Sequence, residues 1–158
     1  MPRIAISGHR GLQAATERLI TEVIRTALAE TSGDITGLSC LADGADQIFA
    51  RGVLDHGGTL EAIVPAENYR AGLPTEAHEE YDRLMDRAAH VHQMSYTDSD
   101  SEAHMAASAY MIDHADELWA VWDGKPARGY GGTADVVAHA RSKGITVRII
   151  WPDGAERD

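Results

Sequence analysis

The chain has 158 residues, of which 44% are hydrophobic and 25% are charged, values typical of one globular domain rather than of a disordered, collagen-like or membrane-spanning chain. Aspartate and glutamate number 25 against 14 lysines and arginines, so the formal charge is −11, and protonation of all 8 histidines would leave the chain acidic. This balance argues against a nucleic-acid partner, whose phosphates require basic side chains, but it allows a small anionic ligand held by a local nest of backbone amides.

Short apolar runs alternate with longer amphipathic segments, which is typical of β-α-β units around a parallel sheet. In the first half of the chain, strands are predicted over Arg3–Ser7, Ile35–Cys40 and Leu60–Val64, and helices over Ala14–Glu30 and Ala45–Leu54. The first helix carries apolar residues at intervals of three and four, so they form one stripe that faces the sheet. The pattern predicts an α/β, Rossmann-like, doubly wound fold with a mainly parallel sheet and helices on both faces.

The middle of the chain is less regular. Residues Ala66–Leu73 are predicted to form a loop, which is either a plain surface connection or a ligand contact. A helix is predicted over Thr75–Ala89, and a short strand over His90–Met94 follows at the edge of the sheet. Ser99 and Glu102 have the spacing of a capping box, so the next helix is predicted to begin there.

The last elements surround a glycine-rich loop. A strand is predicted over Glu117–Trp122, a helix over Thr133–Lys143 and a final strand over Ile145–Trp151. The segment Asp123–Thr133, called the glycine loop below, joins the apolar strand to the helix. In an open α/β sheet, ligands bind beyond the carboxyl ends of the strands, near the point where the strand order reverses. The glycine loop therefore lies at a position that favours ligand binding.

Two loops carry the candidate binding residues. The first follows the first strand, where Gly8 permits close backbone approach, His9 follows it, and Arg10 is a candidate partner for a phosphate or carboxylate. A tight turn with a solvated arginine is the alternative interpretation of this Gly-x-x-Gly sequence. The second is the glycine loop, where Gly131 and Gly132 precede a helix whose first amides are free to bind phosphate.

The alternative interpretation of the glycine loop is a simple helix cap, with the Thr133 hydroxyl satisfying the first turn. Three glycines in four positions exceed what a cap needs, which favours phosphate or nucleotide binding. Lys125 or Arg128 would supply a mobile positive charge beside the phosphate. The sequence lacks the Gly-Lys-Ser/Thr ending of a nucleotide-hydrolase P-loop and lacks a dinucleotide fingerprint after the first strand, so a different class of phosphate site is indicated.

Three blocks of sequence, in this order, resemble the SLOG superfamily of Rossmann-like nucleotide-binding proteins. They are residues 4–10 (IAISGHR), 37–46 (GLSCLADGAD) and 119–124 (WAVWDG) with Gly131-Gly132-Thr133. The superfamily includes the Lonely Guy phosphoribohydrolases, the DNA-processing protein A and the molybdenum-cofactor carrier proteins. The resemblance implies a Rossmann-like fold and a nucleotide-like ligand.

The resemblance also implies roles for single residues. The middle block is similar to a Gly-Leu-Ala-x-Gly-x-Asp stretch of the DNA-processing branch, which carries Gly44 and Asp46 over to the site. Residues 43–46 are thus expected to line the adjacent edge of the ligand site, with Asp43 also a candidate helix cap. The last block is similar to the Pro-Gly-Gly-x-Gly-Thr-x-x-Glu motif of the phosphoribohydrolases, which implies phosphate contacts for its glycines and threonine. Where that motif has its glutamate, this chain has Val136, and the nearby carboxylate is Asp135, one position earlier. Asp135 is thus the candidate catalytic residue, at a helix position turned by about 100°. Asp43, Asp46 and Asp123 are alternatives for this role, although aspartates beside glycines more often cap helices or stabilise turns.

Aromatic side chains near the site have two interpretations. Trp119 and Trp122 lie three apart on one strand, so they point to opposite faces, where core packing is favoured over stacking on a base. Tyr69 and Tyr130 lie in loops and are candidates for contacts with a base or ribose.

No metal or cofactor is expected, because the histidines form neither a His-x-x-x-His pair nor a His-Glu-x-x-His motif. Cys40, the single cysteine, is predicted to be buried and excludes an internal disulfide. No span for a membrane and no leader before the first strand are recognised, so a cytoplasmic location is expected. Neither a linker nor a repeat divides the chain, so one domain is expected over residues 1–152, followed by a short polar tail over 153–158.

Two functions from different classes follow. The first is a binding or sensing module for a nucleotide or nucleotide derivative; the second is a nucleoside 5′-monophosphate phosphoribohydrolase that releases a free base and ribose 5-phosphate. A DNA-handling protein is a third alternative, which the acidic charge disfavours. By resemblance, a homo-oligomer is expected.

Overall fold

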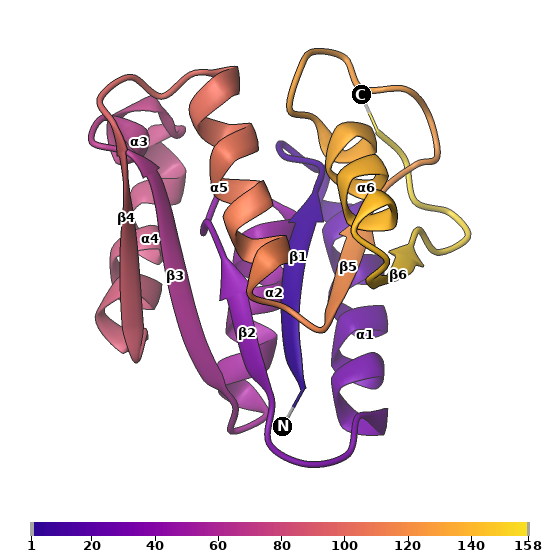
Figure 1. Ribbon diagram of the computed structural model, residues 1–158. Coiled ribbons are helices and arrows are strands. Elements are labelled where there is room, and N and C mark those ends of the chain that lie inside the picture. The colour runs from indigo at the N-terminus through magenta and orange to yellow at the C-terminus, as the bar shows by residue number, and fades with distance from the viewer. Residues whose placement is uncertain (1, 158) are drawn as a thin grey trace.

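The computed structural model describes residues 2–157, and at its centre is a six-stranded sheet in the order β4-β3-β2-β1-β5-β6 (Figure 1). Every pair of neighbouring strands is parallel. The strands are β1 Arg3–Gly8, β2 Thr36–Ser39, β3 Thr59–Ala66, β4 His90–Tyr96, β5 Glu117–Val121 and β6 Thr146–Ile150. The predicted Rossmann-like α/β fold with a parallel sheet is confirmed, and so is the position of β4 at the sheet edge.

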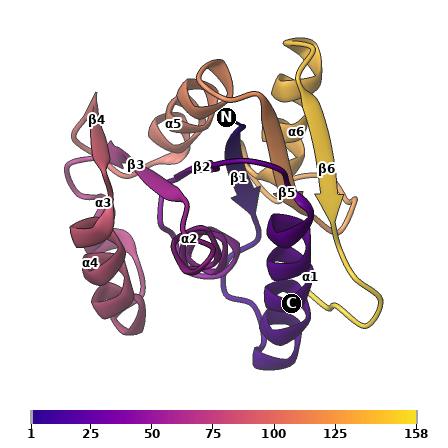
Figure 2. The ribbon, with the colours of Figure 1, turned by 90° about the horizontal axis from the view of Figure 1, so that it is seen from below.

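Helices cover both faces of the sheet. Figure 2 shows α1, α2 and α4 on one side and α5 and α6 on the other. The helices are α1 Ala14–Glu30, α2 Ala45–Asp55, α3 Tyr69–Gly72, α4 His78–Arg87, α5 Ser101–Asp113 and α6 Thr133–Ser142, with a 3₁₀ turn, η1, over Thr75–Ala77. Within residues 2–157, no helix combines the length and the apolar character needed to cross a membrane.

Two clusters of buried apolar residues pack against the sheet, and successive residues of β1 belong to different clusters because their side chains point to opposite faces. On β1, Ile4 and Ile6 pack with the apolar stripe of α1 and with α2, whereas Ala5 packs in the core beneath α5 and α6. Trp119 is fully buried in the α1–α2 core and meets Phe49 edge-on, with ring centroids 5.7 Å apart. Core packing, the favoured interpretation of this tryptophan, is confirmed.

The chain reverses direction across the sheet beside β1. From β1 it builds outward through β2, β3 and β4, and then α5 carries it back to β5 on the other side of β1. The loops that follow β1 and β5 therefore diverge to opposite faces, and the space between them is the switch point of the fold. This topology positions the site described below.

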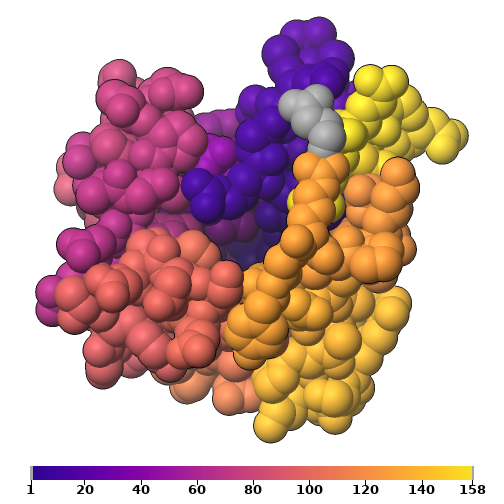
Figure 3. All heavy atoms as spheres, turned by 90° about the horizontal axis from the view of Figure 1, so that it is seen from above, coloured from indigo at the N-terminus to yellow at the C-terminus, as the bar shows by residue number. Residues whose placement is uncertain are grey.

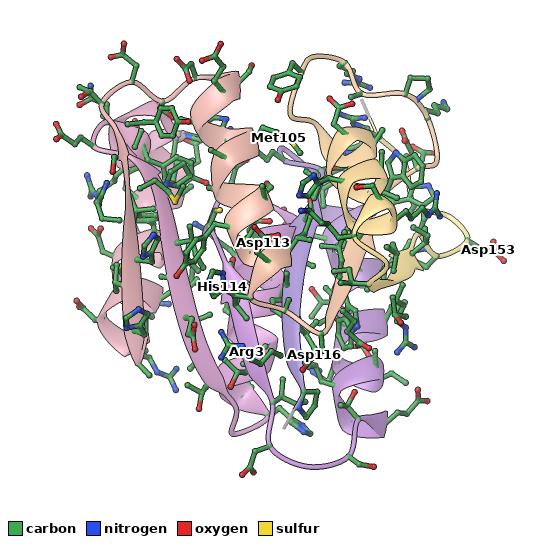
Figure 4. All side chains as sticks on the ribbon, viewed as in Figure 1. Arg3, Met105, Asp113, His114, Asp116 and Asp153 are labelled. Carbon is green, nitrogen blue, oxygen red and sulfur yellow. The ribbon has the colours of Figure 1, made fainter. Side chains whose placement is uncertain are left out.

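At the opposite, N-terminal edge of the sheet, one arginine joins three segments of the chain. The guanidinium of Arg3 donates to both carboxylate oxygens of Glu61, at 2.9 and 3.0 Å, and to the backbone oxygen of His114 at 2.7 Å. The backbone amide of Arg3 donates to Asp116. Figure 4 labels Arg3, His114 and Asp116 along this lower edge, far from the loops after β1 and β5. The contacts of Arg3 at this edge are therefore structural, because they hold separate segments of the chain together.

The predicted start of α5 is wrong by one residue. Asp100, not Ser99, is the cap: its backbone is extended, and its Oδ1 accepts a hydrogen bond of 2.9 Å from the amide of Ala103. The Ser99 hydroxyl instead bonds to Nε2 of His104, at 2.8 Å. Aspartate caps a helix as well as serine does, so a polar run of this kind supports two registers, and tertiary contacts choose between them.

Two further elements differ from their predictions. The segment 66–73, predicted to be a loop, contains the short helix α3, whose Tyr69 is buried against Tyr81. The helix predicted over 75–89 is divided into η1 and α4 and ends at Arg87. Burial of an aromatic side chain orders a segment whose polar composition is typical of a loop.

Candidate functional site

A cavity of about 370 Å³ opens at the C-terminal edge of the sheet, at the switch point beside β1. Its walls come from the loop after β1, the start of α2, the end of β3, α3, α5 and the glycine loop. Figure 3, which looks down on this edge, shows it hollowed between the indigo chain near the N-terminus, the salmon chain of α5 and the orange glycine loop. Segments remote in sequence therefore meet around one space.

Most of the predicted ligand-binding residues line this cavity. They are Gly8, His9, Arg10, Asp46, Arg128, Gly131, Gly132 and Thr133. Tyr69 and Tyr130, the two loop aromatics, line it as well. Three other predicted site residues do not line the cavity: Asp43, Gly44 and Asp135. Neither do Lys125 and Trp122, which lie at the start of the glycine loop, called its root below. There the Trp122 indole donates to the backbone oxygen of Lys125.

The loop after β1 is fixed against the start of α2 by close backbone contact. Gly44 has a φ of +85°, and a Cβ built on it would lie 2.6 Å from the backbone oxygen of His9, so this position requires glycine. The same oxygen accepts a hydrogen bond from the Ala45 amide. Gly44 thus shapes the wall of the cavity from behind.

Asp43 ties the two loops together rather than capping α2, which corrects the role considered for it. One of its oxygens accepts from Nε of Arg10 at 3.0 Å and the other from the amide of Gly11 at 3.0 Å. The cap position of α2 is Gly44, which makes no side-chain cap bond. The pair with Asp43 directs the Arg10 guanidinium, which is 43% exposed, toward the cavity that Arg10 lines.

His9 is a buried, neutral imidazole. Its Nε2 accepts a hydrogen bond of 3.1 Å from the Asp123 amide, which leaves the proton on Nδ1. Burial, and then the positive charge of Arg157, lower the pKa of His9 below its usual value, against the opposing effect of the Asp123 carboxylate. Burial acts to raise the pKa of Asp123, but the Lys125 amide, His9 and Arg157 together hold it below its ordinary value. The root of the glycine loop thus carries an ionised aspartate beside a neutral histidine.

The tip of the glycine loop rests on the first turn of α5. Gly131 has a φ of +85°, and a Cβ at this position would lie 3.0 Å from the backbone oxygen of Ser101. Its amide donates to Oδ2 of Asp135 at 2.9 Å, so the carboxylate predicted as catalytic holds the loop backbone. The Gly132 amide donates to the oxygen of Gly129.

The first amides of α6 are available to a ligand. Among the described residues, neither the amide of Thr133 nor that of Ala134 has a hydrogen-bond partner. Thr133 is the first residue of α6 and lines the cavity, and Gly132 before it is the cap. Two unpaired amides at a helix N-terminus attract an anion through their partial positive charge.

Three arginines from three segments surround the same space: Arg10 from the loop after β1, Arg128 from the glycine loop, and Arg157 from the segment after β6. Arg157 was not predicted as a site residue, because the polar residues 153–158 have the composition of a solvated tail. Neither was His104, which α5 brings to the opposite wall. No local motif marks either residue, and only the tertiary structure brings them to the site.

Asp46 is the single carboxylate that lines the cavity within residues 2–157. Its Oδ2 accepts a hydrogen bond of 3.3 Å from the Ala42 amide. Burial raises the pKa of Asp46 to about 7, and the Ala42 amide and Arg10 offset only part of that effect. An aspartate with this pKa exchanges its proton near neutral pH, which suits a general acid or base.

The wall formed by α3 and α5 is more apolar. Tyr69 and Met111 line it, together with Cys40, which is buried as predicted. Burial raises the pKa of the Cys40 thiol well above its usual value, so the thiol is protonated. His104 meets the Tyr69 ring edge-on at 5.6 Å, and burial, followed by Arg10, lowers its pKa. In the described part of the chain, His, Cys, Asp and Glu form no cluster of three or more that could hold a metal ion.

Comparison with known proteins identifies the fold. No family model and no curated protein matches the chain. Among solved structures, DNA processing protein A from Streptococcus pneumoniae is similar, with a TM-score of 0.70 and 17% identity over 98% of this chain. The chain spans about half the length of that protein, 52% of it.

Two further solved structures share the architecture. DNA processing protein A from Helicobacter pylori, described for its single-stranded DNA binding mode, has a TM-score of 0.69 and 13% identity, covering 98% of this chain and 68% of that one. The molybdenum cofactor binding protein from Rippkaea orientalis has a TM-score of 0.61 and 15% identity, covering 96% of this chain and 77% of that one. At these identities the likeness is one of fold. The chain therefore shares the Rossmann-like fold of these proteins, which is the fold that its sequence resemblance implied.

Proposed function

We propose that this protein binds a phosphorylated small molecule of the nucleotide class in the cavity at the C-terminal edge of the sheet. The charge of the cavity carries the proposal: Arg10, Arg128 and Arg157 line it, although the whole chain has a formal charge of −11. A guanidinium binds phosphate through paired charge-assisted hydrogen bonds. Arginines concentrated around one cavity of an acidic chain favour an anionic ligand.

The remaining lining supports a nucleotide rather than a bare anion. The unpaired amide of Thr133, a residue that lines the cavity, would bind the phosphate, and Tyr69 and Met111 offer an apolar wall to a ring. A volume of about 370 Å³ falls within the range of small-molecule sites. The proposed ligand places its phosphate at the glycine loop and its ring between α3 and α5.

A thermal-shift screen across mono-, di- and cyclic nucleotides and ADP-ribose tests this function, because a ligand that binds only the folded state raises its stability. The matched variants are Arg128→Gln, in the cavity, and Arg141→Gln, which removes the same charge from the exposed face of α6. We expect a shift for at least one phosphorylated compound, lost in the first variant and kept in the second. Equal shifts in both variants, or none with any compound in the parent chain, would refute the proposal.

A phosphoribohydrolase is the second candidate function, and the position of Asp46 favours it. In such a reaction the C1′–N bond breaks, water gives its hydroxyl to C1′, and the base leaves with the proton. Ionised Asp46 would take the proton from that water and pass it to the leaving base, a role suited to its pKa of about 7. Asp135 makes its bond to the Gly131 amide outside the cavity lining, so we assign the proton transfer to Asp46.

Chromatography of each stabilising monophosphate after incubation separates the two functions. Release of free base supports the hydrolase, and recovery of intact nucleotide supports the binding module. If base is released, Asp46→Asn should abolish the release and retain ligand binding, while Asp135→Asn should retain release. The reverse result would restore Asp135 as the catalytic group.

Two partner predictions also need direct tests. The acidic charge predicts no binding to nucleic acid, whereas a protein of the same fold is described for its binding of single-stranded DNA. Fluorescence anisotropy with a labelled single-stranded oligonucleotide at low salt decides between them. The homo-oligomer implied by the resemblance is tested by light scattering of the purified chain.

A further inference from the structure

The segment after β6 returns to the edge of the sheet where the cavity lies. It leaves β6 at Ile150, whose backbone oxygen accepts a hydrogen bond from the Trp122 amide. The next residue, Trp151, places its ring edge-on to His9, with centroids 5.5 Å apart. The segment is thus packed against the loop after β1 at its first residue.

A reciprocal pair of hydrogen bonds fastens the segment to α1. The buried hydroxyl of Thr16 donates to the backbone oxygen of Glu156 at 3.2 Å and accepts from the Glu156 amide at 3.0 Å. The residues before it turn back on themselves through a bond from the Ala155 amide to the Pro152 oxygen. One threonine therefore fixes the backbone next to Arg157.

Arg157 extends from this anchored backbone into the cavity lining. Its Nη1 lies 3.7 Å from Oδ2 of Asp123, and its side chain is 21% exposed. Asp123 already accepts the Lys125 amide and lies against His9. A guanidinium has five N–H donors, and one long ion pair to a shared carboxylate leaves most of them available.

Arg157 lies beside the first residue of the glycine loop, whereas Gly131, at the tip, lies near the other end of that loop. Gly131 rests on the first turn of α5, close to Met105, whereas Arg157 meets Asp123, the first residue after Trp122. Both line the same cavity. One phosphate bound at the first turn of α6 would leave the guanidinium at the loop root without an anionic partner other than Asp123.

We propose that Arg157 is a ligand-binding residue and that the ligand carries two linked phosphoryl groups, one at the glycine loop and one at Arg157. The inference rests on the proposed function and narrows its ligand class to pyrophosphate-bearing nucleotides. The segment after β6 is then part of the binding site, and Thr16 is the positioning residue that holds it there.

Isothermal titration with inorganic phosphate and inorganic pyrophosphate, at matched ionic strength and without divalent metal, tests the inference without knowledge of the base. Arg157→Gln removes the proposed contact. Arg25→Gln removes the same charge from an exposed position on α1, where the side chain is 67% exposed. Thr16→Val releases the segment without removing any charged side chain, and thermal unfolding of each variant checks that it folds.

We expect the parent chain to bind pyrophosphate more tightly than phosphate. Arg157→Gln should weaken pyrophosphate about tenfold, the effect of losing one charge-assisted hydrogen bond, and leave phosphate unchanged within about twofold. Thr16→Val should show the same selective loss, and Arg25→Gln none. Two results would overturn the two-phosphate inference while the proposed function stands. In the first, phosphate and pyrophosphate bind with equal affinity to the parent chain and to Arg157→Gln. In the second, Arg157→Gln weakens the binding of both probes equally. Binding of neither probe by the parent chain would overturn both.

Discussion

Replacing Asp46 by asparagine should stabilise the folded protein, and the gain should grow as the pH rises. Asp46 is half-buried in the cavity wall, and its carboxylate form has lost hydration that one hydrogen bond of 3.3 Å from the Ala42 amide and the charge of Arg10 do not restore. Asparagine keeps an oxygen for the Ala42 amide and is neutral at every pH. The variant therefore isolates the free energy of ionising this one carboxyl in the folded state.

The size and sign of the effect follow from the pKa. A rise from 3.8 to about 7 corresponds to about 4 kcal/mol between the fully protonated and fully ionised limits. Between these two values the unfolded chain has released the proton and the folded chain still holds it, so raising the pH favours unfolding. The stability contributed by the neutral form is complete below about pH 4 and is lost as the pH passes through 7.

Urea unfolding of the parent and Asp46→Asn at pH 4 and at pH 8 measures this difference, because other titrating groups are common to both chains. We expect the variant to gain on the order of 4 kcal/mol over the parent between the two pH values. Asp113→Asn, at an exposed position on α5 labelled in Figure 4, is the control for replacing an aspartate by asparagine outside the cavity. A difference between Asp46→Asn and the parent that stays constant with pH would refute the assignment of a desolvated carboxyl to the cavity wall.

Three other changes test contacts around the site and in the core. Gly131→Ala should lower the free energy of unfolding by about 2–3 kcal/mol, because the φ is strained for alanine and the new Cβ would lie 3.0 Å from the Ser101 oxygen. Gly124→Ala, with a φ of +83° and open space around it, is the control and should lose only about 1 kcal/mol. Equal losses in urea unfolding would contradict the contact between Gly131 and Ser101. Arg157→Gln should raise the pKa of His9, since the arginine charge helps to hold it low, and an unshifted His9 titration in proton NMR would place Arg157 elsewhere. Trp119→Leu should lose about 2–4 kcal/mol, because the indole is fully buried, and a loss below about 1 kcal/mol would show that the core refills the space.

The sheet and its helices were predictable because their apolar periods are strong. The stripe of α1 buries Ile20, Ile24 and Leu28 as its intervals of three and four predict. Element ends were less predictable where competing local signals adjoin, as at Ser99 and Asp100, since either side chain can cap a helix. The order of the strands in the sheet was not predicted, because it depends on contacts between segments remote in sequence.

The site was predictable where it follows strand ends. Gly8 ends β1, Arg10 follows it, and Gly131 lies in the loop after β5. Parallel strands bring the carboxyl ends of β1 and β5 to the same edge of the sheet. Arg157 reaches that edge through two hydrogen bonds to α1, a contact between residues 140 positions apart that no sequence spacing encodes. The protonation behaviour of Asp46 depends on burial, which also appears only when the walls come together.

The reversal of strand order beside β1 has a consequence for how this molecule opens. The cavity walls before the reversal come from residues 6–12, 40–46 and 65–69, and those after it come from 104–111, 128–133 and 157. A molecule bound between them touches both halves of the chain, so it resists any fluctuation that parts one half from the other. Amide hydrogens of β1 and β5, the strands on either side of this boundary, should then exchange with solvent only through global unfolding once the site is filled.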